Sequence, residues 1–501
     1  MGAAVFAIAF LYVYWIAGDV LRTAGDEGIY LEGGRRVALG QQPYRDFLCV
    51  TGPLTFWTEG VVGRWTGLSL AWMRLPMVLD AAFLAWAVYW FTSRWDNVFY
   101  SAGTSLAYLA FQSHIRKLVV NHRWDSAALA TASIAAALAA QRTGRRGLWL
   151  VSGFLVAAAA CATPSMWVVA VPLLCWCWRR GAGAVLEFLG GGALVTGATG
   201  IYLQWHGCLA PMIQGLRWTA ANYTAPNRLF YGHVSMASGD PGGAGVGYWV
   251  SFVYAAIPAI LPVAAMVGWG WRLWRKPDRG EAAEILPLLA AVAALVLSAW
   301  PRWSADTLLH TVALSWCLCA LLLYRVTVAE QRRWLCGAIL LASLLSLGSK
   351  SIAALEYLPR ETRVGTVRAP ADEGEFLAAL ERWVQPGDSL FSFPYEPALY
   401  YWLNAHNPTS YSFLQPGMMT VQDELRAVGE LKAAPPRWVI FEKWPPAAVL
   451  AIWPGSDPAL IPMATMNAYL AQHYRPVDNV TGPWGHMVVM ERAAAPIPEA
   501  R

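Results

Sequence analysis

Charge is what this sequence has least of. Only 14% of its 501 residues are charged, whereas soluble globular proteins carry about 25%. Lysine is scarce, at five of the 37 basic residues, and no polybasic run occurs, which excludes a nucleic-acid-binding protein. The eight cysteines lack metal-ligand spacing, which excludes zinc modules. No internal repeat is visible, which disfavours a transporter built from inverted halves.

Hydrophobic residues, by contrast, make up 57% of the chain. One soluble domain cannot bury so many of them, so lipid is the expected surroundings. The chain is therefore predicted to be a polytopic α-helical membrane protein with about eleven transmembrane helices. The apolar runs that are long enough to span, or nearly so, are residues 3–21, 72–92, 97–113, 125–140, 148–163, 165–178, 184–203, 248–271, 283–299, 306–324 and 334–349.

Basic residues of the short connections fall in alternate loops, which the positive-inside rule assigns to the cytoplasm. The N-terminus is then cytoplasmic and the C-terminus external. The first run lacks the basic start and the cleavage site of a signal peptide, so we expect it to be retained in a multi-pass protein of the plasma (inner) membrane. The residues that set the orientation are Arg94, Arg142, Arg145, Arg146, Arg179, Arg180, Arg272, Arg275, Lys276, Arg279, Arg325, Arg332 and Arg333.

Two parts with different surroundings are expected. Residues 1–349 carry 25 basic and 16 acidic side chains, whereas residues 350–501 carry 12 and 16. In the first part, the membrane module, residues 22–71 and 204–247 form long external segments. Short interfacial helices are predicted at 28–39 and 53–65, and the second segment, with its glycine-rich stretch 238–247, is predicted to be a loop.

The second part, residues 350–501, is predicted to be a small extracytoplasmic α/β domain. Strands are expected at 388–393, 438–442 and 487–491, with helices at 372–384, 397–404 and 421–431. Its aromatic residues either stack against sugar or, as the simpler interpretation, fill the core. They are Tyr395, Tyr400, Tyr401, Trp402 and Tyr411.

Polar residues at the outer edge of the spans gather in three clusters, and such residues mark candidate sites in a chain so poor in charge. The first is explained equally well by a solvated loop that caps a helix. The second breaks the positive-inside trend, which either an anionic ligand or lipid headgroups would explain. The third places an acid and a histidine one helical turn apart. The clusters are Asp26, Glu27, Tyr30, Tyr44, Arg45 and Asp46; His114, Arg116, Lys117, His122, Arg123 and Asp125; and Arg302, Asp306 and His310.

Acids and cations on one side of a membrane suit group transfer from a lipid-phosphate carrier. Cations would hold the phosphate leaving group, while a carboxylate removes the proton of the acceptor hydroxyl. The alternatives are a transporter or flippase of a lipid-linked sugar and a non-catalytic scaffold that binds glycans. Only Asp80 lies deep within a predicted span, although transporters usually place ionisable groups there.

An acidic pair after the first span, followed by G-Q-Q-P-Y-R-D-F at residues 40–47 and a G-P-L turn at 52–54, resembles the GT-C fold membrane glycosyltransferases. The nearest branches are the family 39-like enzymes, which are related to protein O-mannosyltransferases and to the lipid A aminoarabinose transferase. The resemblance covers residues 1–330. It implies an inverting glycosyltransferase that moves a sugar from a polyprenyl-phosphate donor to an extracytoplasmic acceptor, which would be a glycan, a lipid or a protein.

The resemblance also implies roles for single residues. Asp26 would be the general base, or would position the acceptor, with Glu27 as its partner and Asp125 as a further catalytic acid. These three acids could hold a divalent metal, although the sequence requires no cofactor. Relatives often carry Lys or His before the proline of the turn, where this chain has Thr51 and Gly52, so the donor phosphate is expected to depend on other cations. Those are Arg45, His122, Arg123, Arg302 and His310, with Tyr30, Tyr44, Asp46 and Asp306 in support.

Overall fold

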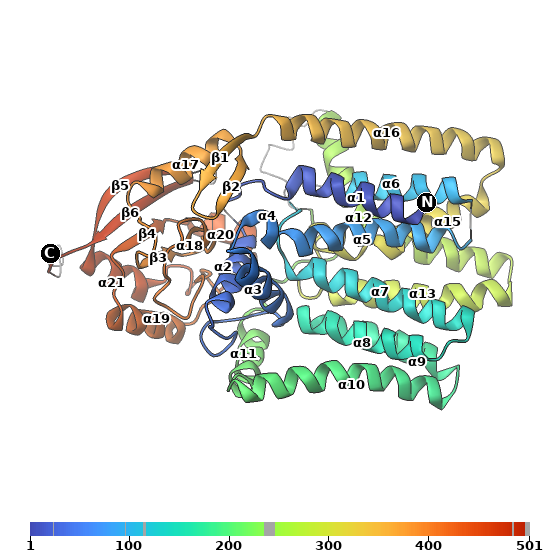
Figure 1. Cartoon of the computed structure of the whole chain (residues 1–501), viewed down its shortest axis with the longest axis horizontal. Coiled ribbons are helices and arrows are strands. Elements are labelled where there is room, and N and C mark those ends of the chain that lie inside the picture. Colours follow the sequence, from blue (N-terminus) through green and yellow to red (C-terminus); the bar gives the residue numbers. More distant parts are fainter. Residues whose placement is uncertain (24, 96, 114–116, 235–245, 483–484, 496–501) are drawn as a thin grey trace.

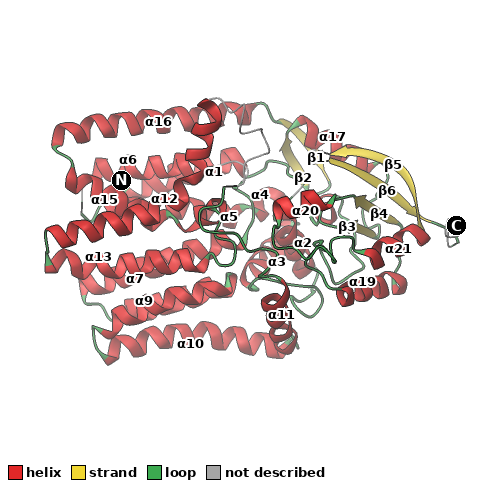
Figure 2. Cartoon of the chain, turned by 180° about the vertical axis from the view of Figure 1, so that it is seen from behind, coloured by secondary structure: helices red, strands yellow, loops and turns green. Residues whose placement is uncertain are grey.

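The computed structural model describes residues 1–23, 25–95, 97–113, 117–234, 246–482 and 485–495. It consists of a helical bundle and an α/β domain that covers one end of the bundle (Figures 1 and 2). Residues 114–116 of the second polar cluster and most of the glycine-rich stretch 238–247 lie outside the described residues.

Every apolar run predicted from the sequence falls on a helix of the bundle. Five helical segments are long and apolar enough to cross a membrane in the described part of the chain, or six if a pair bent by 76° is one span. The chain thus has the helices of a membrane protein, while a count of eleven spans stays a prediction. The bundle helices are α1 (Gly2–Ala17), α5 (Leu75–Thr92), α6 (Val98–Gln112), α7 (His122–Thr143), α8 (Gly147–Ala162), α9 (Trp167–Trp178), α10 (Ala182–Trp205), α12 (Val246–Arg275), α13 (Arg279–Ser298), α15 (Ala313–Val326) and α16 (Ala329–Leu355).

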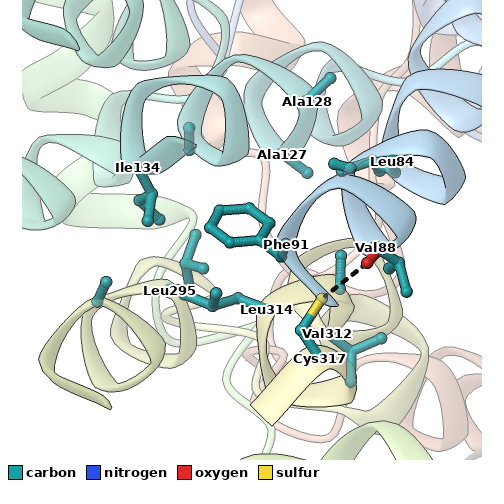
Figure 3. Packing of buried hydrophobic residues seen from close by; sticks show 14 of the residues in the cluster. Leu84, Val88, Phe91, Ala127, Ala128, Ile134, Leu295, Val312, Leu314 and Cys317 are labelled. Atoms are coloured by element: carbon teal, nitrogen blue, oxygen red, sulfur yellow. Dashed lines mark hydrogen bonds between the residues drawn. The ribbon is translucent and has the colours of Figure 1, made fainter. Parts of the chain in front are cut away.

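Small side chains let the central helices approach closely. In Figure 3, Phe91 of α5 lies among alanines of α7 and leucines of α13 and α15, and the Cys317 thiol donates to the carbonyl of Val88 across 3.9 Å. Such packing holds helices together where lipid offers no hydrophobic drive. The span that includes α5 is 56% buried, whereas those of α10 and α16 are 22% and 17% buried, which matches their places at the two edges of the bundle (Figure 1).

The basic connections lie at the end of the bundle away from the α/β domain (Figure 1). Two acids of α13 neutralise part of their charge. Glu284 pairs with Arg142 at 2.8 Å, and Glu281 pairs with Arg272 at 3.1 Å. The predicted segregation of the basic loops to one end is present, and their cytoplasmic orientation stays a prediction.

Short helices form a layer between the bundle and the α/β domain (Figure 1). Both predicted interfacial helices are present, as α2 (Glu27–Ala38) and α3 (Leu54–Thr66), followed by α4 (Leu70–Met73). The expectation of a loop over 204–247 is wrong in part, because α11 (Leu209–Asn222) forms there. None of its 14 residues is buried, so it lacks the deep apolar face by which a sequence reveals a helix. The other short helices are η1 (Pro164–Met166), α14 (Ala305–Leu308) and η3 (Leu309–Thr311).

The α/β domain contains a four-stranded sheet of order β3-β4-β6-β5. β3 and β4 run parallel, whereas β6 is antiparallel to both β4 and β5. The three predicted strands and three predicted helices are all present. Strands β1, β2 and β5 were not expected from the sequence, because they lie largely exposed and lack an apolar run. The elements are β1 (Leu358–Thr362), β2 (Gly365–Ala369), α17 (Ala371–Glu381), β3 (Leu390–Phe393), α18 (Ala398–Trp402), α19 (Val421–Ala433), β4 (Trp438–Glu442), α20 (Pro446–Ile452), α21 (Ala464–His473), β5 (Tyr474–Gly482) and β6 (Gly485–Arg492).

The α/β domain is fixed to the end of α1. Val20 and Arg368 of β2 form a parallel backbone bridge, and the Arg368 guanidinium donates to Asp19 at 2.8 Å. The Trp402 indole donates to the carbonyl of Arg22 at 2.7 Å. Helix α16 continues to Leu355, past the expected boundary at 349, so the bundle and the domain are joined by a continuous helix and a short link.

Candidate active site

Asp26 lies at the layer between the two parts, at the N-cap of α2. Gly25 precedes it with φ 99°, a left-handed conformation that glycine adopts without strain. The Asp26 carboxylate makes no capping bond to the helix and is exposed. It accepts a hydrogen bond of 2.9 Å from the hydroxyl of Tyr395. An exposed carboxylate whose oxygens are not consumed by the backbone is free to accept a substrate proton.

Tyr395 brings the α/β domain into this site. Its ring contacts those of Phe413, Trp444 and Trp453, with centroids 5.1, 6.2 and 5.4 Å away. Burial and then the charge of Asp26 raise the pKa of Tyr395 well above its usual range. The phenol therefore stays protonated and remains a donor to Asp26.

Two arginines lie near Asp26 and Tyr223. Tyr223, just after α11, is within electrostatic reach of Arg123, Asp26 and Arg302, while burial is the main reason that its pKa is raised. Within the described chain, the Arg123 side chain makes no hydrogen bond or ion pair, and Arg302 reaches only the carbonyl of Ile452 at 3.5 Å. Two guanidinium groups with unused donors beside a carboxylate could hold a phosphate next to a base.

Glu27 is bonded in the interior and not to Asp26, Arg123 or Arg302. It is buried and forms a two-pronged ion pair with Arg74, at 2.7 and 2.6 Å. It also accepts from the amide of Val120 at 2.9 Å, while Arg74 donates to the carbonyls of Ala17 and Val20. Glu27 thus ties α2 to the end of α1, the start of α5 and the segment before α7.

Asp125 belongs to a separate group of acids, in which Glu59 is buried while Asp80 and Asp125 are half-buried. Its carboxylate accepts a hydrogen bond from Thr55 and lies within hydrogen-bond reach of Asp80. Glu59 of α3 lies near both Asp125 and Glu27, and one of its oxygens is buried without a hydrogen-bond partner among the described residues. Burial first, then these two acids, raise the pKa of Glu59 well above its usual range. This group adjoins the site but is not joined to Asp26 by any of these contacts.

The two histidines are buried beside the site. His122 bonds Thr163 at 2.6 Å, and its ring lies 5.6 Å from that of Tyr30. The ring of His310 packs edge-on against Trp124 at 4.8 Å. Burial, followed by the charge of Asp26, raises the pKa of Tyr30 well above its usual range. Tyr30 thus lies within electrostatic reach of Asp26 and Arg123, and both histidines lie within reach of Arg123.

Asp306 pairs with Lys117 at 2.9 Å, and the two side chains are 34% and 36% exposed. Lys117 belongs to the second polar cluster of the sequence and Asp306 to the third, so this ion pair joins them. Asp306 also lies within electrostatic reach of Arg302.

The side chains of the motif at residues 40–47 bond mainly to neighbouring residues of the same segment. Arg45 is 44% exposed and pairs with Asp46 at 2.8 Å. It also donates to the carbonyl of His206 at the end of α10. Tyr44 adopts φ 68° and donates to the carbonyl of Thr51 at 2.6 Å. None of these contacts joins Arg45 to Asp26, Arg123 or Arg302.

Asp26, Glu27 and Asp125 do not converge as a set of metal ligands. The oxygens of Glu27 are used by Arg74 and Val120, and Asp125 faces Thr55 and Asp80. In the parts of the chain that the structure describes, no three His, Cys, Asp or Glu residues lie close enough to hold a metal.

Three site residues escape the sequence pattern. Arg74 stands alone at the start of an apolar run, and only the pairing with Glu27 reveals its use. Tyr223 lies in a segment expected to be a loop. Tyr395, considered from the sequence only for sugar stacking or core packing, lies two residues beyond the predicted strand 388–393, and its place beyond the end of a buried strand is the signal that could have assigned it to the site.

Comparisons with known proteins give the fold. No family model and no curated protein matches this chain. Its structure is similar to ArnT from Cupriavidus metallidurans in the apo state, with TM-score 0.59, 14% identity and 99% of each chain covered, and to ArnT bound to undecaprenyl phosphate, with TM-score 0.58, 13% identity and the same coverage. It is also similar to the archaeal oligosaccharyltransferase AglB from Archaeoglobus fulgidus in complex with an inhibitory peptide and a dolichol-phosphate, with TM-score 0.54 and 10% identity over 99% of this chain and 75% of that one.

At such low identity the likeness establishes the architecture and leaves the chemistry to the residues themselves. Both the bundle and the α/β domain are included in the match to ArnT, because it covers 99% of both chains. The chain has the GT-C fold.

Proposed function

We propose that this protein is an inverting glycosyltransferase that moves a sugar from a polyprenyl-phosphate donor to the hydroxyl of an extracytoplasmic acceptor. The observation that carries the proposal is the exposed Asp26 carboxylate, bonded by Tyr395, with Arg123 and Arg302 close enough that all three charges act on Tyr223. ArnT and AglB, whose fold it shares, were solved with undecaprenyl phosphate and with dolichol-phosphate.

In this mechanism the acceptor oxygen attacks the anomeric carbon from the face opposite the phosphate. The new carbon–oxygen bond forms as the bond to the phosphate oxygen breaks, which inverts the configuration. Asp26 takes the proton of the acceptor hydroxyl. The leaving phosphate receives the electron pair and is stabilised by Arg123 and Arg302, whose charge makes a proton donor unnecessary.

Replacing Asp26 with Asn tests the proposal. The amide keeps the shape of the side chain but cannot take the proton, so transfer should fall by about 10²- to 10⁴-fold. Membrane insertion and binding of polyprenyl phosphate should remain. Asp372→Asn changes an exposed acid in the first turn of α17 and should leave transfer intact. Full activity of the Asp26 variant in a purified system would refute the assignment.

A transporter or flippase of a lipid-linked sugar is the second candidate. Asp80 lies within α5 and in reach of Asp125, and intramembrane acids are typical of transport pathways. Donor that reaches the protein from the cytoplasmic side of inverted vesicles and appears unchanged on the other side would favour this candidate. Release of free polyprenyl phosphate would favour the transferase.

A further inference from the structure

The carboxyl ends of β3 and β4 meet beside Asp26. These two strands are parallel, so their carboxyl ends share one edge of the sheet. Tyr395 and Glu396 follow β3, while Glu442 ends β4 and Trp444 comes just after it. Ligands of open α/β sheets bind at this kind of edge.

Aromatic surface is concentrated at the edge. The rings of Trp444 and Trp453 are stacked, with centroids 5.4 Å apart and planes 14° apart, and both rings contact Tyr395. Tyr395 and Trp444 are half-buried, whereas Trp453 is only 6% exposed and supports them from the core; Tyr400, Tyr401, Trp402 and Tyr411 are buried and form core. The part of the predicted sugar-stacking set that lies at this edge is therefore Tyr395, joined by two tryptophans.

A buried polar atom at the same edge lacks a partner. In the described part of the chain, one carboxylate oxygen of Glu396 makes no hydrogen bond, and the residue is only 6% exposed. The nearby Glu442 carboxylate and Trp444 indole nitrogen, in contrast, lie close enough to partner each other. Buried polar groups are nearly always paired in folded proteins, so the Glu396 oxygen indicates a polar ligand that completes it.

Glu396 connects the aromatic edge to the catalytic residue. Burial first, and then the charges of Glu442, Glu373 and Asp26, raise its pKa well above the usual range. It is therefore within electrostatic reach of both Glu442 and Asp26. In its protonated form, which this shift favours, Glu396 can donate one hydrogen bond as well as accept others.

We propose that Tyr395, Trp444, Trp453, Glu396 and Glu442 form a subsite for the sugar ring of a carbohydrate acceptor. The inference rests on the proposed transferase function and names its acceptor class. Aromatic faces contact the apolar face of the ring, and the two acids bond its hydroxyls. Because the edge carries two acids, neutral or amino sugars fit it, whereas phosphorylated or acidic sugars do not.

Saturation-transfer NMR on the purified full-length protein in nanodiscs, without donor, tests the subsite. The probes are methyl glycosides of neutral hexoses and of N-acetylglucosamine, with a threonine-containing peptide as the rival acceptor. We expect the glycosides to bind, and Trp444→Leu to weaken that binding by about tenfold. Trp65→Leu, on an 85% exposed residue of α3, is the matched control and should bind as the wild type does.

Two further variants keep the test decisive if Trp444→Leu does not fold. Trp444→Phe preserves a stacking face and should retain binding, whereas Glu442→Ala removes hydrogen bonds and should weaken it. Binding of the peptide instead of the glycosides, equal binding by all variants, or no glycoside binding at millimolar concentrations would overturn the subsite. None of these outcomes bears on transfer by wild type and Asp26→Asn, so the two proposals fail separately.

Discussion

Glu27 and Arg74 form a two-pronged ion pair in the interior, 3% and 1% exposed, directly beside the exposed Asp26. Two adjacent acids of one motif thus have opposite surroundings. Glu27 is enclosed and fully bonded, whereas Asp26 faces Tyr395 and the arginines. This difference separates a residue that holds the layer of short helices from one that is available for chemistry.

Glu27→Gln should destabilise the protein strongly. The change leaves the Arg74 guanidinium buried without its counter-charge, which costs about 3 to 5 kcal/mol. Thermal unfolding of the detergent-solubilised protein measures the loss. The double variant Glu27→Gln with Arg74→Met removes the unpaired charge and should regain part of the stability. A stable single variant that lacks only activity would instead make Glu27 a catalytic acid.

Arg123→Gln and Arg302→Gln should each weaken donor binding. A hydrogen bond to a charged group is worth about 1.5 to 3 kcal/mol, so we expect the KM for the donor to rise by about tenfold or more. The change in kcat should be smaller if the contact forms already in the ground state.

Arg45→Gln is the matched control, because Arg45 is exposed and pairs with Asp46 and His206. Its donor KM should equal that of the wild type. If Arg45→Gln impaired donor binding as much as Arg123→Gln, the phosphate would have to be assigned to the loop of residues 40–47.

Tyr395→Phe should slow transfer while leaving the donor KM unchanged. It removes the 2.9 Å hydrogen bond that orients Asp26, which corresponds to about a twofold to tenfold decrease in kcat. Tyr411→Phe removes a similar bond, from Tyr411 to Asp423 at 3.1 Å, away from Asp26, and should not change kcat. Equal rates for both variants would show that the bond to Asp26 does not orient the base.

Glu59→Gln should stabilise the protein at high pH. The folded state holds the proton of Glu59 more tightly than the unfolded chain, whose carboxyl has a pKa near 4.5. Wild-type stability therefore falls as pH rises above that value. The variant has no such carboxyl. The difference between its melting temperature and that of the wild type should therefore grow as the pH is raised from about 5 to about 8, above the pKa of the unfolded carboxyl. Glu330→Gln, at an exposed residue of α16, should show no such trend.

Continuous apolar runs and buried strands were predictable from the sequence because each depends on local composition. All eleven runs became helices, and the strand that ends at Phe393 is where the pattern predicts it. α11 was not predictable, since its helical residues remain unburied. The pairing of Glu27 with Arg74 was not predictable either, because it joins residues whose contact is set by how α2 and α5 meet in space.

The residues that meet at the candidate site were only partly predictable from the sequence. Asp26, Arg123 and Arg302 share one neighbourhood around Tyr223. Arg45 has the expected charge, yet local bonds to Asp46 hold it elsewhere. Tyr395, 369 positions from Asp26, enters the site through the docking of a whole domain, which no local pattern encodes.

That docking limits how the gene could be recombined. The α/β domain supplies the hydroxyl on Asp26, a backbone bridge to Val20 and the partner of Asp19. A domain taken from another GT-C protein would therefore have to restore these contacts, and the hydrogen bond from Trp402 to Arg22, with the first 26 residues of the chain. The N-terminal helix and the C-terminal domain are the pieces that must be exchanged together, although they lie at opposite ends of the sequence.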